Sequence, residues 1–382
     1  MAVSVDLPPP SSSALEVSAE LTRVIRAEIR SAGGWLDFSR YMELVLYTPG
    51  LGYYSAGSAK LGPSGDFVTA PELSGLLGRA LARTLRAELG GTAAPVILEL
   101  GAGSGALVAQ ILDALADLRP TYLILEPSAD LRERQARSLA RFAGRVSWLD
   151  RLPAQPNAHA IIANEVLDAL PVSRFAKWGE RIVPLGAVEQ GDGFAWADGP
   201  ERDELTVAVG ALERALGAPL PDGYESEIAL QLPAWLASVA AVIDRGCMLL
   251  VDYGLVRREY YHPQRSAGTL ICHYRHRAHD DPFLYPGLQD ISAWVDFSAC
   301  ADAARAEGLD VAGFTTQAQF LLATLGAEPP TTGTDAAALR ERSALKTLLL
   351  PGEMGERFKV LMLRKGAAFG GELPGRDLRG WL

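Results

Sequence analysis

A glycine-rich turn between a predicted strand and a predicted helix constrains the fold of this chain most strongly. The apolar run 96–100 predicts a buried strand, and the segment 99–105 (ELGAGSG) leads from it into a predicted helix over 106–116. The glycines permit a tight turn and let a ligand approach the backbone closely. The turn therefore predicts a ligand-binding site at the end of a strand in an α/β fold.

Further short apolar runs alternate with helical stretches after this turn. We predict strands at 122–125, 145–149, 159–164 and 246–253, and a last, antiparallel strand at or near the sheet edge at 358–363. Strands that alternate with helices form right-handed βαβ units and a parallel sheet. The sequence thus predicts a Rossmann-like, mostly parallel sheet with an N-terminal helical cap and inserted segments.

Two acidic residues at strand ends favour S-adenosyl-L-methionine as the ligand. Glu99 stands just before the turn, where a carboxylate can take the positively charged amino group of the methionine part. Glu126 ends the next strand, where its carboxylate can accept both ribose hydroxyls. The residues predicted to bind this cofactor are Glu99, Gly101, Gly103, Gly105, Glu126 and Asn164.

The turn by itself leaves two alternatives open. The spacing Gly101-x-Gly103-x-x-Ala106 also fits a dinucleotide fingerprint, which would make the chain an NAD(P)-dependent oxidoreductase. A strand-to-helix turn can also require glycine for its own geometry alone.

Polar residues after the strand 159–164 predict the acceptor side of the site. Asn164, Glu165 and Asp168 follow this strand, and ligands of open parallel sheets lie beyond the carboxyl ends of the strands. Carboxylates there can orient a cationic nucleophile such as a guanidinium or remove its proton, although a proline-terminated turn capped by Asp168 would also explain the pattern. We assign catalytic roles to Glu165, Asp168 and Asp66, and expect Asp66 to come close to the other two from the helical cap.

The segment before the strand 96–100 is predicted to be mostly helical. Thr69, Pro71 and Glu72 predict a capping box with proline in the first turn, followed by leucines at helical spacing. The predicted organisation is a flexible arm at 1–13, a helical cap at 14–94, a cofactor-binding core at 95–176, an insertion at 177–235, the rest of the core at 236–366 with a substrate loop at 262–297, and a tail at 367–382.

Composition and charge exclude several classes of protein. The net charge of −10 argues against a nucleic-acid partner, and the sequence has no apolar run long enough for a transmembrane helix.

Three widely spaced cysteines and a start without a signal or transit pattern predict a bacterial cytoplasmic protein. His276, His279 and the two aspartates that follow are a weak metal motif, and we interpret them as part of a hydrogen-bonded substrate loop.

Several runs of residues make the chain resemble the MidA family of class I methyltransferases, which includes a mitochondrial protein that assists assembly of respiratory complex I. The most specific runs are Gly65–Glu72 and His279–Phe297, and Asn164–Val172 and Val251–Gly254 add to the match. The resemblance implies the class I fold, S-adenosyl-L-methionine as cofactor, and an arginine of a protein substrate as methyl acceptor. A protein that binds the methyl donor as an assembly factor without catalysis is the remaining alternative.

Overall fold

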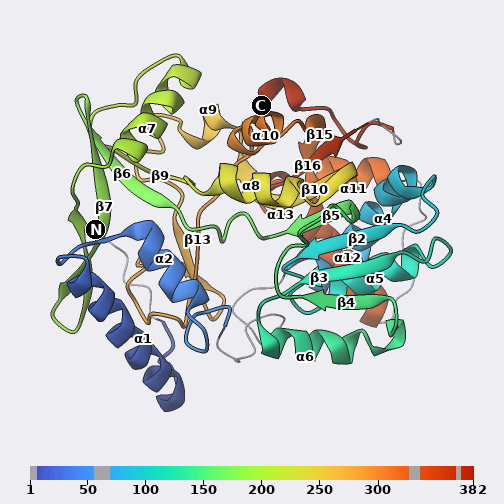
Figure 1. Cartoon of the computed structure of the whole chain (residues 1–382), viewed down its shortest axis with the longest axis horizontal. Helices are drawn as coiled ribbons and strands as arrows, with labels where there is room; N and C mark the ends of the chain where they lie inside the picture. The colour runs from blue at the N-terminus through green and yellow to red at the C-terminus, as the bar shows by residue number, and fades with distance from the viewer. Residues whose placement is uncertain (1–6, 56–68, 327–335, 367–370) are drawn as a thin grey trace. The chain divides into compact units, whose positions relative to one another are not determined.

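The computed structural model describes residues 7–55, 69–326, 336–366 and 371–382 (Figure 1). The chain forms two compact units, each built from separate segments of the sequence. The first unit comprises Met1–Phe67, Asp168–Leu232 and Arg257–Trp294, and the second comprises Val68–Leu167, Pro233–Val256 and Val295–Leu382. The segment 14–94, which the sequence suggested as one helical cap, is thus divided between the two units.

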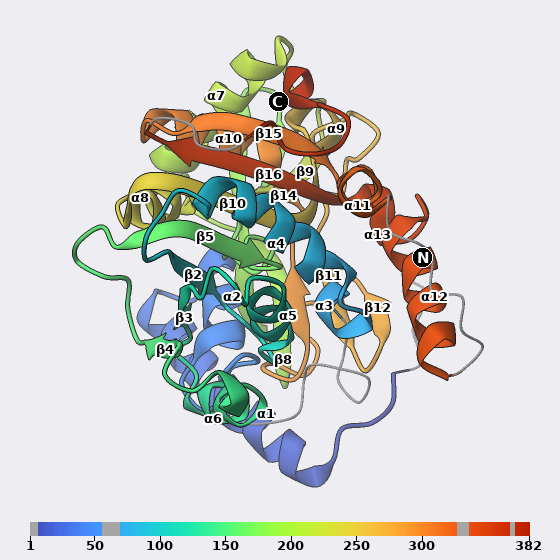
Figure 2. The ribbon, with the colours of Figure 1, turned by 90° about the vertical axis from the view of Figure 1, so that its right-hand side faces the viewer.

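The second unit contains an eight-stranded sheet. Seven strands follow one another in the order β15-β16-β10-β5-β2-β3-β4, as Figure 2 shows from top to bottom, and the short β14 pairs with β10. The strands are β2 (Val96–Leu100), β3 (Thr121–Leu125), β4 (Val146–Leu149), β5 (Ala158–Asn164), β10 (Ile243–Leu255), β14 (Val295–Asp296), β15 (Asp310–Thr316) and β16 (Phe358–Lys365). All neighbours pair in parallel except β16, which is antiparallel to both β10 and β15.

This sheet confirms the predicted fold class. The strand order reverses between β2 and β5, so the carboxyl ends of these two strands flank the position where open parallel sheets bind ligands. The last strand is antiparallel as predicted and lies one place inside the edge. The edge strand β15 escaped prediction because it contains Gly313 and its register against β16 shifts between Val311 and Gly313, so no regular apolar pattern marks it.

Helices cover both faces of this sheet. On one face α4 (Leu76–Leu89) and α5 (Ala106–Ala114) form a continuous apolar core with the sheet, and both lie in front of the strands in Figure 2. On the other face α10 (Phe297–Ala306) packs Phe297 against Phe314 of β15, with the ring centroids 5.4 Å apart. The further helices of this unit are α3 (Ala70–Leu73), α6 (Ala129–Ser138), α8 (Leu232–Ala240, whose first residue belongs to the first unit), α11 (Gln317–Leu325), α12 (Ala336–Leu349) and α13 (Met354–Arg357), with short 3-10 turns at Ala140–Phe142 and Arg379–Trp381.

The predicted capping box at Thr69 is wrong. Thr69 precedes α3, but its side chain makes no capping hydrogen bond, and the helix stops after Leu73. The amide of Gln110 in α5 explains the interruption, because its Nε2 donates to the carbonyl oxygens of Pro71 at 2.7 Å and Ser74 at 3.4 Å. The leucine stripe that follows does face the core, as the buried Leu77, Leu81 and Leu85 of α4 show.

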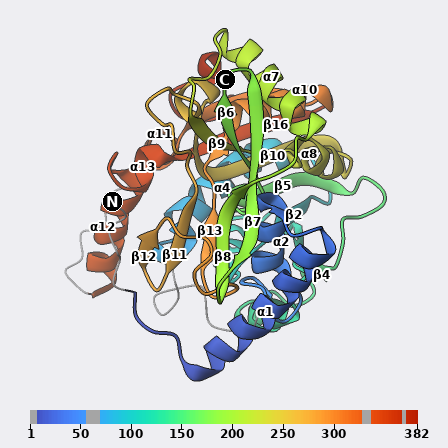
Figure 3. The same cartoon turned by 90° about the vertical axis from the view of Figure 1, so that its left-hand side faces the viewer.

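The first unit contains two antiparallel sheets (Figure 3). The larger has the order β1-β7-β6-β9 with β8 on β7, and the smaller has the order β12-β11-β13. The strands are β1 (Leu36–Asp37), β6 (Ser173–Trp178), β7 (Arg181–Gln190), β8 (Gly193–Asp198), β9 (Tyr224–Ile228), β11 (Ile271–Tyr274), β12 (Arg277–His279) and β13 (Asp290–Ser292), and the helices are α1 (Ser12–Ser31), α2 (Phe38–Tyr47), α7 (Asp203–Leu216) and α9 (Arg257–Tyr260). Strands β7 and β8 form a hairpin, and α7 follows it, within the segment 177–235 that was predicted to be an insertion.

Across the part of the chain that the structure describes, no helix is both long enough and apolar enough to span a bilayer.

Candidate functional site

The glycine turn joins β2 to α5 at the carboxyl end of the sheet. Gly101, Gly103 and Gly105 all have positive φ angles of 63°, 52° and 83°, a backbone conformation that costs other residues strain energy. A Cβ atom on Gly105 would lie 3.2 Å from Ser138 Oγ and 3.3 Å from a methyl carbon of Leu139. The turn therefore requires glycine for its own geometry, and its first glycine, Gly101, is exposed.

Glu99 lies under this turn and is almost completely buried. Its side chain is 2% exposed, and the hydroxyl of Tyr122 on the neighbouring strand β3 donates a hydrogen bond to Oε2. Burial raises the pKa of Glu99 to about 7, against the smaller lowering effect of the Tyr122 hydroxyl. The carboxylate thus occupies the core side of the sheet, in an environment that disfavours its charge.

Glu126 follows β3 and is tied to the glycine turn. Its Oε1 accepts from the backbone N–H of Ser128 at 2.9 Å, and its Oε2 accepts from Nε2 of Gln135 at 3.3 Å. The same Gln135 nitrogen donates to the carbonyl of Gly103 at 2.9 Å, while Nε1 of Trp148 donates to the Gln135 oxygen at 2.8 Å. Gln135 therefore fixes the distance between the turn and the Glu126 carboxylate, a role that no sequence pattern marked.

Burial also affects the charge of Glu126, whose side chain is 4% exposed. Burial raises its pKa, while the hydrogen bonds from Ser128 and Gln135 and the positive charge of Arg132 act in the opposite direction. A diol that donates two hydrogen bonds to this carboxylate would further favour its charged form.

Asn164 and Glu165 lie at the carboxyl end of β5, next to the switch in strand order. Glu165 has a φ of +53°, which is rare for a residue with a side chain and typical of functional sites. Asn164 Nδ2 donates to Glu165 Oε1 at 3.2 Å, and among the described residues the buried Asn164 Oδ1 has no hydrogen-bond partner. A donor group of a ligand or a water molecule can satisfy an amide oxygen in this state.

Asp252 on β10 holds the chain that follows Glu165. Its Oδ2 accepts from the N–H groups of Val166 at 3.1 Å and Leu167 at 2.9 Å, and its Oδ1 accepts from Tyr253 N at 2.9 Å. The Asp252 side chain is 1% exposed. A buried carboxylate that accepts several N–H groups fixes their geometry firmly, so Asp252 stabilises the strained backbone at Glu165.

Asp168 and Asp66 are the other two residues to which the sequence assigned catalytic roles. Asp168 begins a segment of the first unit, where it is buried and its carbonyl oxygen accepts from Ala293 N at 3.1 Å. Asp66 lies outside the described residues. The catalytic roles assigned to these two aspartates remain predictions.

Glu72 is a further acidic residue at the glycine turn, assigned only a capping role from the sequence. It lies in α3, which packs against α5, the helix that follows the turn. Burial raises the pKa of Glu72, and the Ser104 contact lowers it. Nothing in the sequence marks the helix break after Leu73, so Glu72 was predicted only to cap a helix.

The histidine-rich segment forms a hairpin of β11 and β12 in the first unit. Cys272 pairs with His279 across this hairpin, and His276 lies in its turn with a φ of +61°. Among the described residues, no group of three or more His, Cys, Asp or Glu side chains could hold a metal ion.

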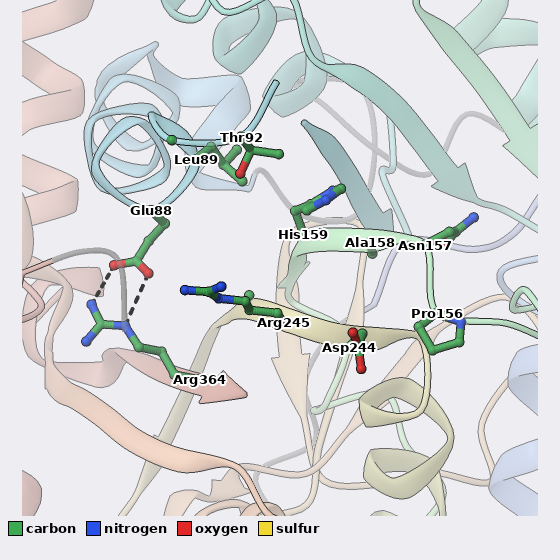
Figure 4. Close-up of a pocket in the computed structure, with 12 residues that line it drawn as sticks. Glu88, Leu89, Thr92, Pro156, Asn157, Ala158, His159, Asp244, Arg245 and Arg364 are labelled. Carbon is green, nitrogen blue, oxygen red and sulfur yellow. Dashed lines mark hydrogen bonds and ion pairs between the residues drawn. The ribbon is translucent and has the colours of Figure 1, made fainter. Parts of the chain in front are cut away.

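A cavity of about 430 Å³ lies at the opposite edge of the same sheet, where β5 and β10 begin. Figure 4 shows Glu88 and Arg364 facing each other across one side of it, where Arg364 Nε donates to Glu88 Oε2 at 3.1 Å. Ala158 at this edge and Asn164 at the glycine-turn edge are about 20 Å apart along β5. The cavity is therefore separate from the glycine turn, and its ion pair offers a control position within the same unit.

The residues at the carboxyl edge fit S-adenosyl-L-methionine. The glycine turn exposes Gly101 at this edge, and Glu126 follows the next strand, where its carboxylate is predicted to accept the ribose hydroxyls. Asn164 Oδ1 and Glu72 Oε2 are buried acceptors without a partner among the described residues, so both can receive donor groups of a ligand.

Comparison with known proteins identifies the family. Residues 76–315 match the family described as "Putative S-adenosyl-L-methionine-dependent methyltransferase". A solved structure from Burkholderia thailandensis, bound to S-adenosyl-homocysteine, has a TM-score of 0.87 and 42% sequence identity, covering 97% of this chain and 99% of that chain.

Two similar proteins from animals share the name of the protein arginine methyltransferase NDUFAF7. The mitochondrial NDUFAF7 homolog of Drosophila melanogaster is 28% identical, covering 94% of this chain and 88% of the relative. The mouse NDUFAF7 is 28% identical, covering 90% of this chain and 84% of the relative. The chain therefore belongs to the MidA family of S-adenosyl-L-methionine-dependent methyltransferases.

Proposed function

We propose that this methyltransferase modifies arginine side chains of a protein substrate. The relatives from Drosophila and mouse are named protein arginine methyltransferases, which supports a protein acceptor. The observation that carries the proposal is the Glu165 carboxyl group, held at the carboxyl end of β5 by a left-handed backbone and a contact with Asn164. A carboxylate is the natural partner of a guanidinium, because it accepts two of its hydrogen bonds at once.

In the proposed reaction Glu165 binds the guanidinium and turns one of its nitrogens toward the methyl group. The bound donor supplies an electrophilic methyl carbon, whose bond to sulfur breaks as the bond to nitrogen forms. The Glu165 carboxylate accepts the proton that this nitrogen loses and passes it to solvent. Asp252 fixes the backbone on which Glu165 depends, so the group is positioned before the substrate arrives.

The test measures donor binding and methyl transfer separately in Glu165→Gln. Glutamine has nearly the same shape but cannot take a proton, so we expect the dissociation constant for S-adenosylhomocysteine to change less than about threefold. We expect methyl transfer to fall at least a hundredfold, within the usual contribution of a general base. Transfer is measured with labelled S-adenosyl-L-methionine and the proteins of a lysate from a strain that lacks this gene. Undiminished transfer by Glu165→Gln would remove this residue from the acceptor site.

The same experiment identifies which amino acid accepts the methyl group. After acid hydrolysis of the labelled proteins, methylarginine is the expected product, and label in another amino acid or in a small molecule would overturn the proposal. A wild-type protein that binds S-adenosylhomocysteine yet labels nothing would favour the non-catalytic assembly factor. The methyltransferase relatives give no support to the nicotinamide oxidoreductase.

A further inference from the structure

The cofactor's methionine part carries an ammonium group, and the structure offers two acidic residues for it. Glu99 was the expected partner, but its carboxylate faces the core together with Tyr122 and is 2% exposed. The strand pairing explains this direction, because Glu99 and Ile97 lie on the same face of β2 and Ile97 is part of the core beneath α4 and α5. Glu99 therefore lies on the core face of β2, where it accepts the hydrogen bond from Tyr122.

Glu72 lies in α3, which packs against α5, the helix that follows the same turn. The hydroxyl of Ser104 in the turn acts on its carboxyl group and lowers the pKa of that group, against the larger raising effect of burial. The oxygen Oε2 of Glu72 is buried and meets no hydrogen-bond partner among the described residues. A buried carboxylate oxygen without a donor is unfavourable, and a cation that donates to it removes that penalty.

The position of Glu72 is fixed by contacts on both sides of it in the chain. Gln110 of α5 donates to the carbonyls of Pro71 and Ser74, at 2.7 and 3.4 Å. These two bonds fasten α3 to the helix that begins at the glycine turn, so the carboxyl group keeps its place relative to the turn. The turn's Ser104 is itself held, since its carbonyl accepts from Ser138 Oγ at 3.1 Å.

We propose that Glu72, and not Glu99, binds the ammonium group of the methionine part of S-adenosylmethionine and S-adenosylhomocysteine. An ammonium has three donors and no acceptor, which suits a carboxylate with one unsatisfied oxygen. This assignment concerns donor binding only, so it stands or falls independently of the arginine acceptor.

Three ligands separate this role from a structural one. S-adenosylhomocysteine carries the whole amino-acid part, its desamino analogue lacks only the ammonium group, and methylthioadenosine lacks the whole amino-acid part. In Glu72→Gln we expect the affinity for S-adenosylhomocysteine, measured by calorimetry, to fall about ten- to a hundredfold, the loss expected for a charge-assisted hydrogen bond. The affinities for the other two ligands should change less than about threefold. Ser104→Ala should give the same selective pattern with a smaller loss, and it serves where Glu72→Gln folds poorly.

Two controls complete the experiment. Glu88→Gln alters a buried acid at the opposite edge of the sheet and should leave all three affinities unchanged. Glu99→Gln should change the affinity for S-adenosylhomocysteine less than about threefold. Equal weakening of all three ligands by Glu72→Gln would give this residue a structural role only, and selective weakening by Glu99→Gln would restore the original assignment. A wild-type protein that fails to bind S-adenosylhomocysteine would contradict donor binding itself.

Discussion

Replacement of Glu126 by alanine tests how the second acidic residue contributes to cofactor binding. Its carboxylate is 4% exposed and already accepts from Ser128 N and Gln135 Nε2, with the remaining lone pairs available to a diol. A pair of hydrogen bonds to a charged group contributes about 1.5–3 kcal/mol, which corresponds to about a ten- to a hundredfold loss of affinity in Glu126→Ala.

The loss in Glu126→Ala should depend on the ribose hydroxyls. Calorimetry measures the affinities of the wild type and the variant for S-adenosylhomocysteine and for its 2′-deoxy analogue. The four affinities together give the coupling free energy between the Glu126 side chain and the 2′-hydroxyl. Because the deoxy ligand has already lost one of the two bonds, the mutation should weaken it less than it weakens the complete ligand.

Folding and protonation are controlled in the same assay. Circular dichroism establishes that the variant is folded. Because burial raises the pKa of Glu126, we expect wild-type affinity to fall as the pH is lowered toward that pKa, and we expect this dependence to weaken in the variant. Equal affinities of wild type and folded Glu126→Ala for the complete ligand would refute the assignment of this residue to the ribose.

Three further predictions concern the turn and the residues around it. Gly103→Val should abolish detectable binding of S-adenosylhomocysteine in calorimetry, because a branched side chain strains a backbone with a φ of +52° and stands where the ligand approaches. Glu99→Gln should remove a pH dependence of the free energy of unfolding. In the wild type the pKa of Glu99 is raised to about 7 in the folded state, which stabilises the folded protein below pH 4.5. This contribution, on the order of 3 kcal/mol, is lost as the pH rises to 7. Asp252→Asn should lower methyl transfer more than tenfold with donor affinity changed less than about threefold, and should speed amide exchange at Val166 and Leu167.

Each of these predictions has a matched control. Gly144→Val imposes a similar strain at a φ of +80° with no atom within 4 Å of the added Cβ, so it should lose stability and keep cofactor binding. The Glu99→Gln comparison uses chemical unfolding from pH 4 to 8, and parallel curves for variant and wild type would show that the Glu99 pKa is not raised. Glu88→Gln breaks a buried ion pair, so it should destabilise the protein without slowing transfer. If Glu88→Gln lost as much methyl transfer as Asp252→Asn, the effect of Asp252→Asn would be explained by lower stability of the fold alone.

The sequence by itself determined the parallel sheet and the edge at which we predict that the cofactor binds. Strands β2 and β5 at the centre of the sheet contain short buried apolar runs, and this pattern depends only on neighbouring residues. The glycine turn and the acid at Glu126 follow their strands directly in the chain, and the carboxyl ends of parallel strands share one edge. Local pattern therefore sufficed for the fold class, the cofactor and the side of the sheet on which Asn164 and Glu165 lie.

Only the tertiary structure decided which side chains connect these groups. Gln135 bridges Gly103 and Glu126, and Asp252 supports the backbone after Glu165, across elements that are distant in the sequence. The sequence pattern does not distinguish Gln135 or Asp252 from other glutamines and aspartates. Strand pairing and helix packing bring their backbone partners within reach only in the folded protein. The same holds for Glu72, since the hydrogen bonds of Gln110 to the carbonyls on either side of it interrupt the expected helix and set the carboxyl group against the turn.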